Sequence, residues 1–149
     1  MVTPRLEVLC ICLLLSIPLL NAQDISKAAA SAYTKGNYAA AIEYYEKLLI
    51  DDPDNGVYHH NLGVSYLLSN SHKVKAIAHL EAAEKIEGYE TEVIYHLARS
   101  YHLNNEFDQA IETYLRYQRE SGGRSEKVDR HIGNCYSAKK LITKPVSVS

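Results

Sequence analysis

Apolar and polar positions alternate with a helical period along most of the chain between residues 24 and 140. Apolar side chains recur at offsets of three and four, which places them on one face of a helix. Polar or glycine-containing turns at 35–37, 52–56, 104–105 and 122–123 separate the periodic stretches. The pattern predicts helices over Asp24 to Lys35, Tyr38 to Ile50, Gly56 to Ser69, Lys73 to Glu87, Thr91 to Leu103, Phe107 to Glu120 and Glu126 to Lys140.

The helical pattern repeats itself with a period of 34 to 35 residues. One column holds small residues, at Ala29, Gly63, Ala98 and Gly133. Tyrosine follows three positions later in three of these cases, at Tyr66, Tyr101 and Tyr136. A second column pairs alanine with isoleucine, at Ala41-Ile42, Ala76-Ile77 and Ala110-Ile111. A small side chain lets a second helix approach closely, so each repeat is predicted to be an antiparallel helical hairpin.

These columns resemble the tetratricopeptide repeat family. The resemblance is carried by the stretch from Asn37 to Tyr45, closed by Asp52-Pro53, and by Asn61 to Tyr66 in the next unit. It implies an all-α fold, a right-handed α-solenoid of antiparallel helical hairpins over residues 23–140. Three repeats would be followed by a single helix, from Glu126 to Lys140, that caps the apolar end of the stack.

The N-terminal residues 1–22 are predicted to be a secretory signal peptide. Arg5 precedes an apolar run from Val8 to Leu20, and Ala22 supplies the small residue before the expected cleavage point. The run is 13 residues long, whereas roughly 20 are needed to cross a bilayer as a helix. We therefore expect an exported protein with no membrane span after cleavage, periplasmic or associated with the outer membrane if bacterial and secreted otherwise.

Residues 141–149 form an extended tail or linker in this interpretation. Apolar and polar residues alternate after Pro145, which is typical of the start of a β segment. Together with the signal and the repeats, the tail resembles the N-terminal part of Bacteroidota envelope proteins. Those proteins join such repeats to a β-propeller and an OmpA-like domain, and some belong to the type IX secretion and gliding apparatus. The tail therefore leads us to expect the first part of a longer chain.

Composition narrows the function. The chain has 16 basic and 18 acidic residues and a formal charge of −2. It therefore lacks the excess of positive charge that attracts the phosphates of nucleic acids. It holds 12 tyrosines, one phenylalanine and no tryptophan. Tyrosine at this density is typical of helix–helix contacts and binding faces, because its ring packs against apolar groups while its hydroxyl stays in contact with water.

Candidate chemistry is sparse. The chain has seven histidines, but none lies three or four residues from another, so a metal site would have to assemble from different repeats. Cys135 is the one cysteine left after cleavage, and its place on an apolar helix face favours packing over catalysis. We find no phosphate-binding glycine loop and no nucleophile elbow. The sequence therefore predicts no catalytic residues, no metal site and no cofactor.

Function is instead expected on the concave face of the stack, where the first helix of each repeat lies. The resemblance implies groove-facing positions at Tyr33, His60, Val64, Leu67, Tyr95, Arg99, His102, Lys127, Arg130 and Asn134. The early groove is small and apolar, whereas the later groove carries three cations. Carboxylates are the natural complement of such cations, so we expect a protein or peptide partner with acidic character.

Two functions remain open at this point. The first is a non-catalytic, exported protein-interaction scaffold within a cell-envelope assembly, which binds a partner peptide or helix in its groove. The second is a docking or regulatory domain of a secreted enzyme whose catalytic part lies outside this chain. Downstream propeller repeats and an OmpA-like domain would favour the first, and a hydrolase motif would favour the second.

Overall fold

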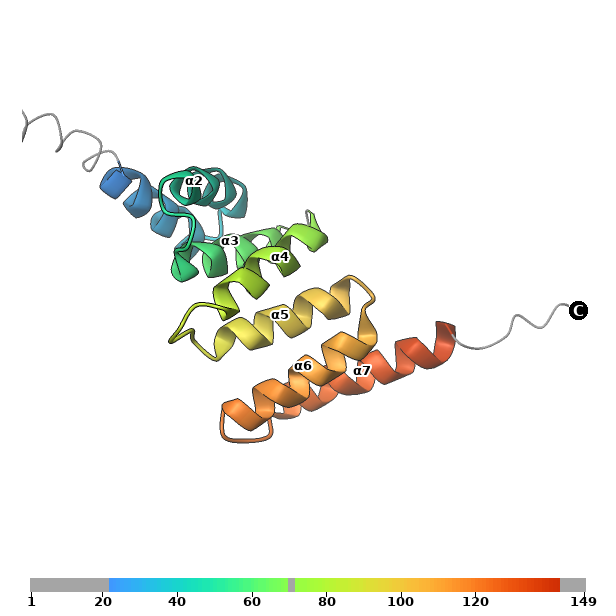
Figure 1. Ribbon diagram of the computed structural model, residues 1–149. Helices are drawn as coiled ribbons and strands as arrows, with labels where there is room; N and C mark the ends of the chain where they lie inside the picture. Colours follow the sequence, from blue (N-terminus) through green and yellow to red (C-terminus); the bar gives the residue numbers. More distant parts are fainter. Residues whose placement is uncertain (1–21, 70–71, 143–149) are drawn as a thin grey trace, which may run out of the picture.

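The computed structural model describes residues 22–69 and 72–142, and the described chain is helical with short turns (Figure 1). The predicted signal peptide, except Ala22, and the expected β segment lie outside the described residues. The helices are the first helix, residues 22–34, and α2 (Tyr38–Asp51), α3 (Gly56–Leu68), α4 (Lys73–Glu84), α5 (Glu92–Leu103), α6 (Phe107–Glu120) and α7 (Glu126–Ile142). No strand occurs within the described residues, and the all-α prediction is confirmed.

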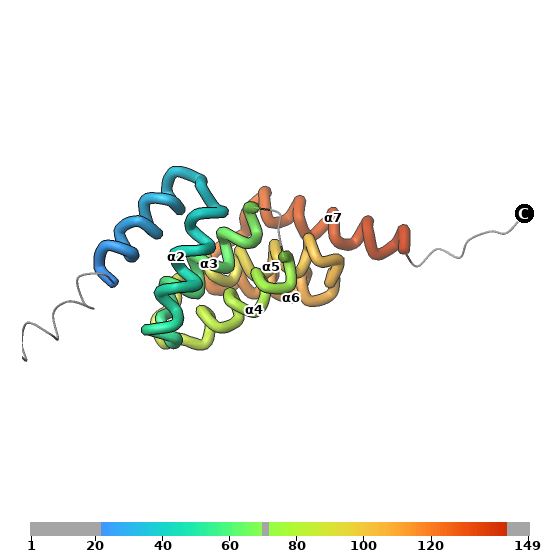
Figure 2. Tube along the Cα trace, turned by 90° about the horizontal axis from the view of Figure 1, so that it is seen from above, coloured from blue at the N-terminus to red at the C-terminus, as the bar shows by residue number. Residues whose placement is uncertain are grey.

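The helices stack one after another along a single axis, with the first helix at one end and α7 at the other (Figures 1 and 2). We call the first helix, α3, α5 and α7 the A helices, and α2, α4 and α6 the B helices. Each helix packs on its neighbour in sequence from α2 to α7, and α3 also touches α5 directly. The arrangement is the predicted solenoid of helical hairpins, closed by the single helix α7.

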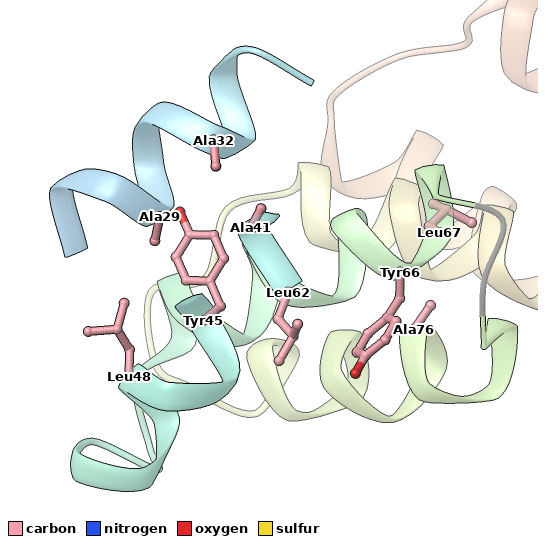
Figure 3. Packing of buried hydrophobic residues seen from close by; sticks show 9 residues of the cluster. All are labelled: Ala29, Ala32, Ala41, Tyr45, Leu48, Leu62, Tyr66, Leu67 and Ala76. Carbon is pink, nitrogen blue, oxygen red and sulfur yellow. The ribbon is translucent and has the colours of Figure 1, made fainter. Parts of the chain in front are cut away.

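The core of the first hairpins lies between the first helix, α2, α3 and α4. Tyr45 and Tyr66 are the largest residues of this core, and the alanines of the cluster let the helices approach closely. Figure 3 shows the cluster, made of Ala29, Ala32, Ala41, Tyr45, Leu48, Leu62, Tyr66, Leu67 and Ala76. The two repeat columns recognised in the sequence therefore supply the buried contacts between helices.

A tyrosine hydroxyl ties each of the two middle A helices, α3 and α5, to the B helix before it. Tyr66 on α3 donates a hydrogen bond to the carboxylate of Glu46 on α2. One period later, Tyr101 on α5 donates to Glu81 on α4, over 2.6 Å from hydroxyl to carboxylate oxygen. The recurring tyrosine is thus a packing residue and also a polar link between successive repeats.

The turn between α4 and α5 differs from its prediction. The helical pattern extends to Glu87, but α4 ends at Glu84, where the Lys85 amide bonds back to Ala82. Gly88 then adopts a left-handed φ of +79°, a conformation that ends helices. The side chain of Ile86 lies against Gly56, where an added Cβ would stand 3.1 Å from the Ile86 Cβ. This packing of the turn on α3 ends the helix three residues early and helps to shape the surface described below.

Candidate functional site

The predicted groove residues do not share one environment. Val64 and Leu67 are only 1% and 4% exposed, because α3 turns them into the core. Val64 packs in the same cluster as Leu80 of α4 and Leu97 of α5. A partner cannot contact either side chain, so neither belongs to the candidate site.

Tyr95 of α5 is the centre of the strongest grouping. The ammonium of Lys127 lies 4.8 Å from its ring centroid, and the guanidinium carbon of Arg99 lies 5.9 Å from it. Both distances are within the range of cation–π attraction. Three helices meet here, because the Tyr117 ring of α6 stands 5.4 Å from Tyr95, centroid to centroid. We call Tyr95, Arg99 and Lys127 the cationic cluster.

A second layer of rings supports the cationic cluster. His131 of α7 stacks on Tyr114 of α6, with centroids 5.4 Å apart and planes at 5°. His102 meets the edge of His131 at 5.9 Å, and Tyr95 lies 6.3 Å from the same ring. The predicted residue His102 is therefore brought to the cluster. Burial lowers the pKa of His102 and of His131, and nearby positive charges lower both further.

The remaining two predicted residues of α7 stand apart. Arg130 is exposed, and its guanidinium pairs with Glu126 over 3.2 Å on the same helix. Asn134 is also exposed. An exposed ion pair within one helix is worth little, so Arg130 belongs to the rim and not to the cationic cluster.

Sequence reasoning did not select His131, Tyr114 or Tyr117 for this site. Tyr114 lies four residues after Ala110 of the second repeat column, and it is fully buried. His131 and Tyr117 were not selected because the resemblance counts groove positions only on A helices and does not place His131 among them. The sequence spacing could have identified His131 as a site residue, since it lies four residues after Lys127 and shares its helical face.

A histidine pair joins α3 to α5 on the same side of the molecule. The rings of His60 and His96 lie 5.5 Å apart, centroid to centroid. Burial is the main cause that lowers both pKa values, and that of His96 falls to about 4. Both rings are therefore neutral near pH 7. The Nε2 atom of His60 is buried and has no hydrogen-bond partner among the described residues.

Another histidine pair, between α3 and α4, tests the idea of a metal site. The Nδ1 atoms of His59 and His79 are 2.9 Å apart, and His59 Nε2 lies 2.8 Å from the Pro53 carbonyl oxygen. His59 thus donates from Nε2 and accepts at Nδ1. The ring centroids are 5.2 Å apart, so the two nitrogens face each other head on, as in an N–H···N bond. Two imidazoles that share a metal ion direct their lone pairs to a common point instead.

The described residues contain no group of three or more His, Cys, Asp or Glu side chains arranged to hold a metal ion. Cys135 is a buried free thiol, and burial raises its pKa. It is therefore inert packing and not an activated nucleophile.

The two other predicted residues, Tyr33 and His60, line a cleft of about 750 Å³. The cleft lies between the turn that precedes α3 and the turn that follows α4, and residues of the first helix, α3, α4 and α5 also line it. Four carboxylates line it, those of Asp52, Asp54, Glu87 and Glu90. No lysine or arginine is among its lining residues. We call it the acidic cleft.

The solenoid and its surface define the class of protein. Stacked helical hairpins without catalytic geometry in the described part, but with charged and aromatic side chains gathered on the A helices, are typical of repeat proteins that bind other proteins. The tetratricopeptide repeat model matches residues 26–90, and a second model with the same description matches residues 93–124. The chain belongs to the tetratricopeptide repeat family.

Solved structures with the same fold include the Sgt2 tetratricopeptide repeat domain from Aspergillus fumigatus. It is 19% identical to this chain, with a TM-score of 0.67, and the alignment covers 87% of each chain. The first such domain of human RPAP3 is 17% identical, also with a TM-score of 0.67, over 83% of this chain and 97% of that one. A comparison with curated proteins gives no significant match. These likenesses support the fold alone.

Within residues 22–69 and 72–142, no helix combines the length and the apolar character that crossing a membrane requires.

Proposed function

We propose that this protein is a non-catalytic interaction module that binds an acidic peptide or helix of a partner protein on its A-helix face. Family membership supports a protein-interaction role in general. The observation that carries the specific proposal is the cationic cluster, in which Lys127 and Arg99 both lie against the ring of Tyr95.

The geometry suits a carboxylate ligand. The guanidinium of Arg99 can bind a carboxylate through two parallel hydrogen bonds. Arg99 is half-buried on α5, and Lys127 is exposed on α7, so one cation is partly desolvated and the other completes the rim. The aromatic ring of Tyr95 offers a flat apolar contact for the methylene groups beside the carboxylate.

We further propose that the protein works outside the cytoplasm, as part of a cell-envelope assembly. The support is the N-terminal apolar run with Ala22 at its end, and the resemblance of the chain to Bacteroidota envelope proteins. Mass spectrometry of the exported protein should find a new N-terminus after Ala22. An intact Met1 would contradict the export proposal.

Crosslinking and pull-down from envelope extract would identify the partner, and calorimetric titration would then test the groove. Arg99→Ala should weaken binding by about 2 kcal/mol or more, because it leaves a desolvated carboxylate unpaired. Lys47→Ala, which removes an exposed cation of the B helix α2, is the matched control and should leave affinity unchanged. Equal affinities of wild type and both variants would show that the A-helix face is not the binding site.

A further inference from the structure

The acidic cleft and the cationic cluster are neighbours on one face of the solenoid. His60 lines the cleft and lies 5.5 Å from His96, which in turn lies 5.5 Å from Tyr95 of the cationic cluster. These two steps place the His60 ring within about 11 Å of the Tyr95 ring. An extended peptide advances about 3.3 Å per residue. A single short segment can therefore reach both sites at once.

The charges of the two sites are opposite. The acidic cleft carries four carboxylates without a basic residue among its lining residues. The carboxylate of Asp52 already has a partner within its own turn, because it accepts a hydrogen bond from the side-chain amide of Asn55 over 2.8 Å. Asp54 and Glu90 are exposed at the rim and come from opposite walls of the cleft. Both residues line the cleft, and their negative charges favour a cation there.

The walls of the cleft suit a long side chain with a charged end. Tyr33 and Tyr89 line it together with the aliphatic side chains of Val57, Ile86 and Val93. Lysine and arginine bury their methylene stems against such surfaces while the charged end stays near polar groups. The Nε2 atom of His60, another lining residue, is buried and has no hydrogen-bond partner among the described residues. Burial keeps this ring neutral by lowering its pKa.

A second hollow, on the B-helix side, lacks this character. It has a volume of about 440 Å³ and is lined by residues of both charges from α4, α5 and α6. Its Glu84 is already paired with Arg116, over 2.5 Å. The uncompensated charge is thus a property of the acidic cleft and not of every hollow on this surface.

We propose that the acidic cleft receives a lysine or arginine side chain of the same segment whose carboxylates bind at the cationic cluster. The groove then selects a mixed-charge segment, with a basic residue about three positions from an acidic one. Such a double requirement fixes the register of the bound segment and rejects segments that carry only acidic charge. This inference rests on the proposed function, since it assumes that the cationic cluster binds the acidic part.

The test is selection of a displayed library of random peptides, each about 12 residues long, on the intact protein. Wild type should enrich peptides that carry both an acidic and a basic residue. The double variant Asp54→Asn with Glu90→Gln should keep the acidic enrichment and lose the basic one. The matched control, Glu43→Gln with Asp51→Asn, removes two exposed carboxylates of α2 and should select the same peptides as wild type.

One selected peptide is then titrated against each variant, after melting curves have shown that the variants are folded. The double variant should weaken binding about fivefold to tenfold. Replacing the basic residue of the peptide by alanine should cost the same factor in wild type and nothing more in the double variant, because the two changes remove one interaction.

The outcomes separate the two proposals. Acidic enrichment without basic enrichment in wild type would overturn the mixed-charge inference and leave the proposed function intact. Basic enrichment that survives in the double variant would also overturn it. Absence of acidic enrichment would overturn the proposed function, and the mixed-charge inference with it.

Discussion

Tyr101 and Tyr136 occupy the same column of the repeat, one period apart, but within the described part of the chain only Tyr101 of this pair bonds a carboxylate. Tyr101→Phe should lower the free energy of unfolding by about 1 to 2 kcal/mol, because Glu81 loses a hydrogen bond to its charged group. Tyr136 is 57% exposed, and Arg116 stands where the period would place the next glutamate. Tyr136→Phe should therefore change stability by less than about 0.5 kcal/mol. Chemical denaturation of both variants would measure the difference, and equal losses would contradict the proposed link between repeats.

Gly63 and Gly133 form a second matched pair. An added Cβ on Gly63 would lie 2.7 Å from Cγ of Leu80 and 3.2 Å from the Ala76 carbonyl oxygen, whereas nothing lies within 4 Å of such an atom on Gly133. Gly63→Ala should destabilise the protein by about 1 to 3 kcal/mol through overpacking. Gly133→Ala should stabilise it by up to about 1 kcal/mol, because alanine favours the helical backbone. Thermal melts should thus shift in opposite directions, and a shift of both in one direction would refute this account of the contacts.

At the scale of elements, α7 acts as the cap of the stack. It buries Val128 and Cys135 against α6. Asp129 stands one period after the fully buried Ile94, but it is only partly buried. Asp129 accepts a hydrogen bond from Gln118 over 2.8 Å and pairs with Arg124 over 3.2 Å. The hydrogen bond from Gln118 is the main cause of its lowered pKa. A helix with one apolar and one polar face closes a solenoid, because it needs no further neighbour.

Removing this cap gives a direct prediction. Deletion of residues 126–149 should expose the apolar side of α6 and promote aggregation. Light scattering combined with size-exclusion chromatography would detect it. Deletion of residues 143–149 alone is the control and should leave the protein as soluble as the full chain. If both truncated chains stay equally soluble, α7 is not required to cover the stack.

For the whole molecule, the half-buried histidines predict a dependence of stability on pH. Burial lowers the pKa values of His60, His79, His96, His102 and His131, so the folded state holds these rings neutral. The unfolded chain takes up protons near pH 6.5, and the free energy of unfolding should therefore fall as pH falls from about 6.5 to about 4. For His96, whose pKa falls to about 4, the loss is at most about 3 kcal/mol.

Denaturation at a series of pH values would test this dependence. His60, Arg99 and Lys127 are the charged or titratable neighbours that further lower the pKa of His96. His96→Gln should flatten the dependence on pH, because one half-buried base is removed. His72→Asn is the control, since His72 is exposed and asparagine tolerates its left-handed φ of 53°. A stability that stays constant from pH 7 to pH 4 would contradict the prediction.

The sequence by itself determined the helices, their order and their pairing into hairpins. Of the twelve boundaries of α2 to α7, eleven fall within two residues of the periodic pattern, and the end of α4 is the exception. The reason is physical: offsets of three and four select a helical face locally, and the small residues at Ala41, Gly63 and Ala110 fix where the next helix can approach. Family membership follows from the same columns.

Only the tertiary structure decided which of the predicted groove side chains are exposed to solvent. Val64 and Leu67 have the sequence spacing of groove residues, but neighbouring helices cover them. His131 joins Tyr95 from a helix 36 residues further along the chain, and the acidic cleft unites two turns that the sequence separates. These groupings depend on how far each helix rotates and shifts against the next, and a repeat period does not encode that rotation.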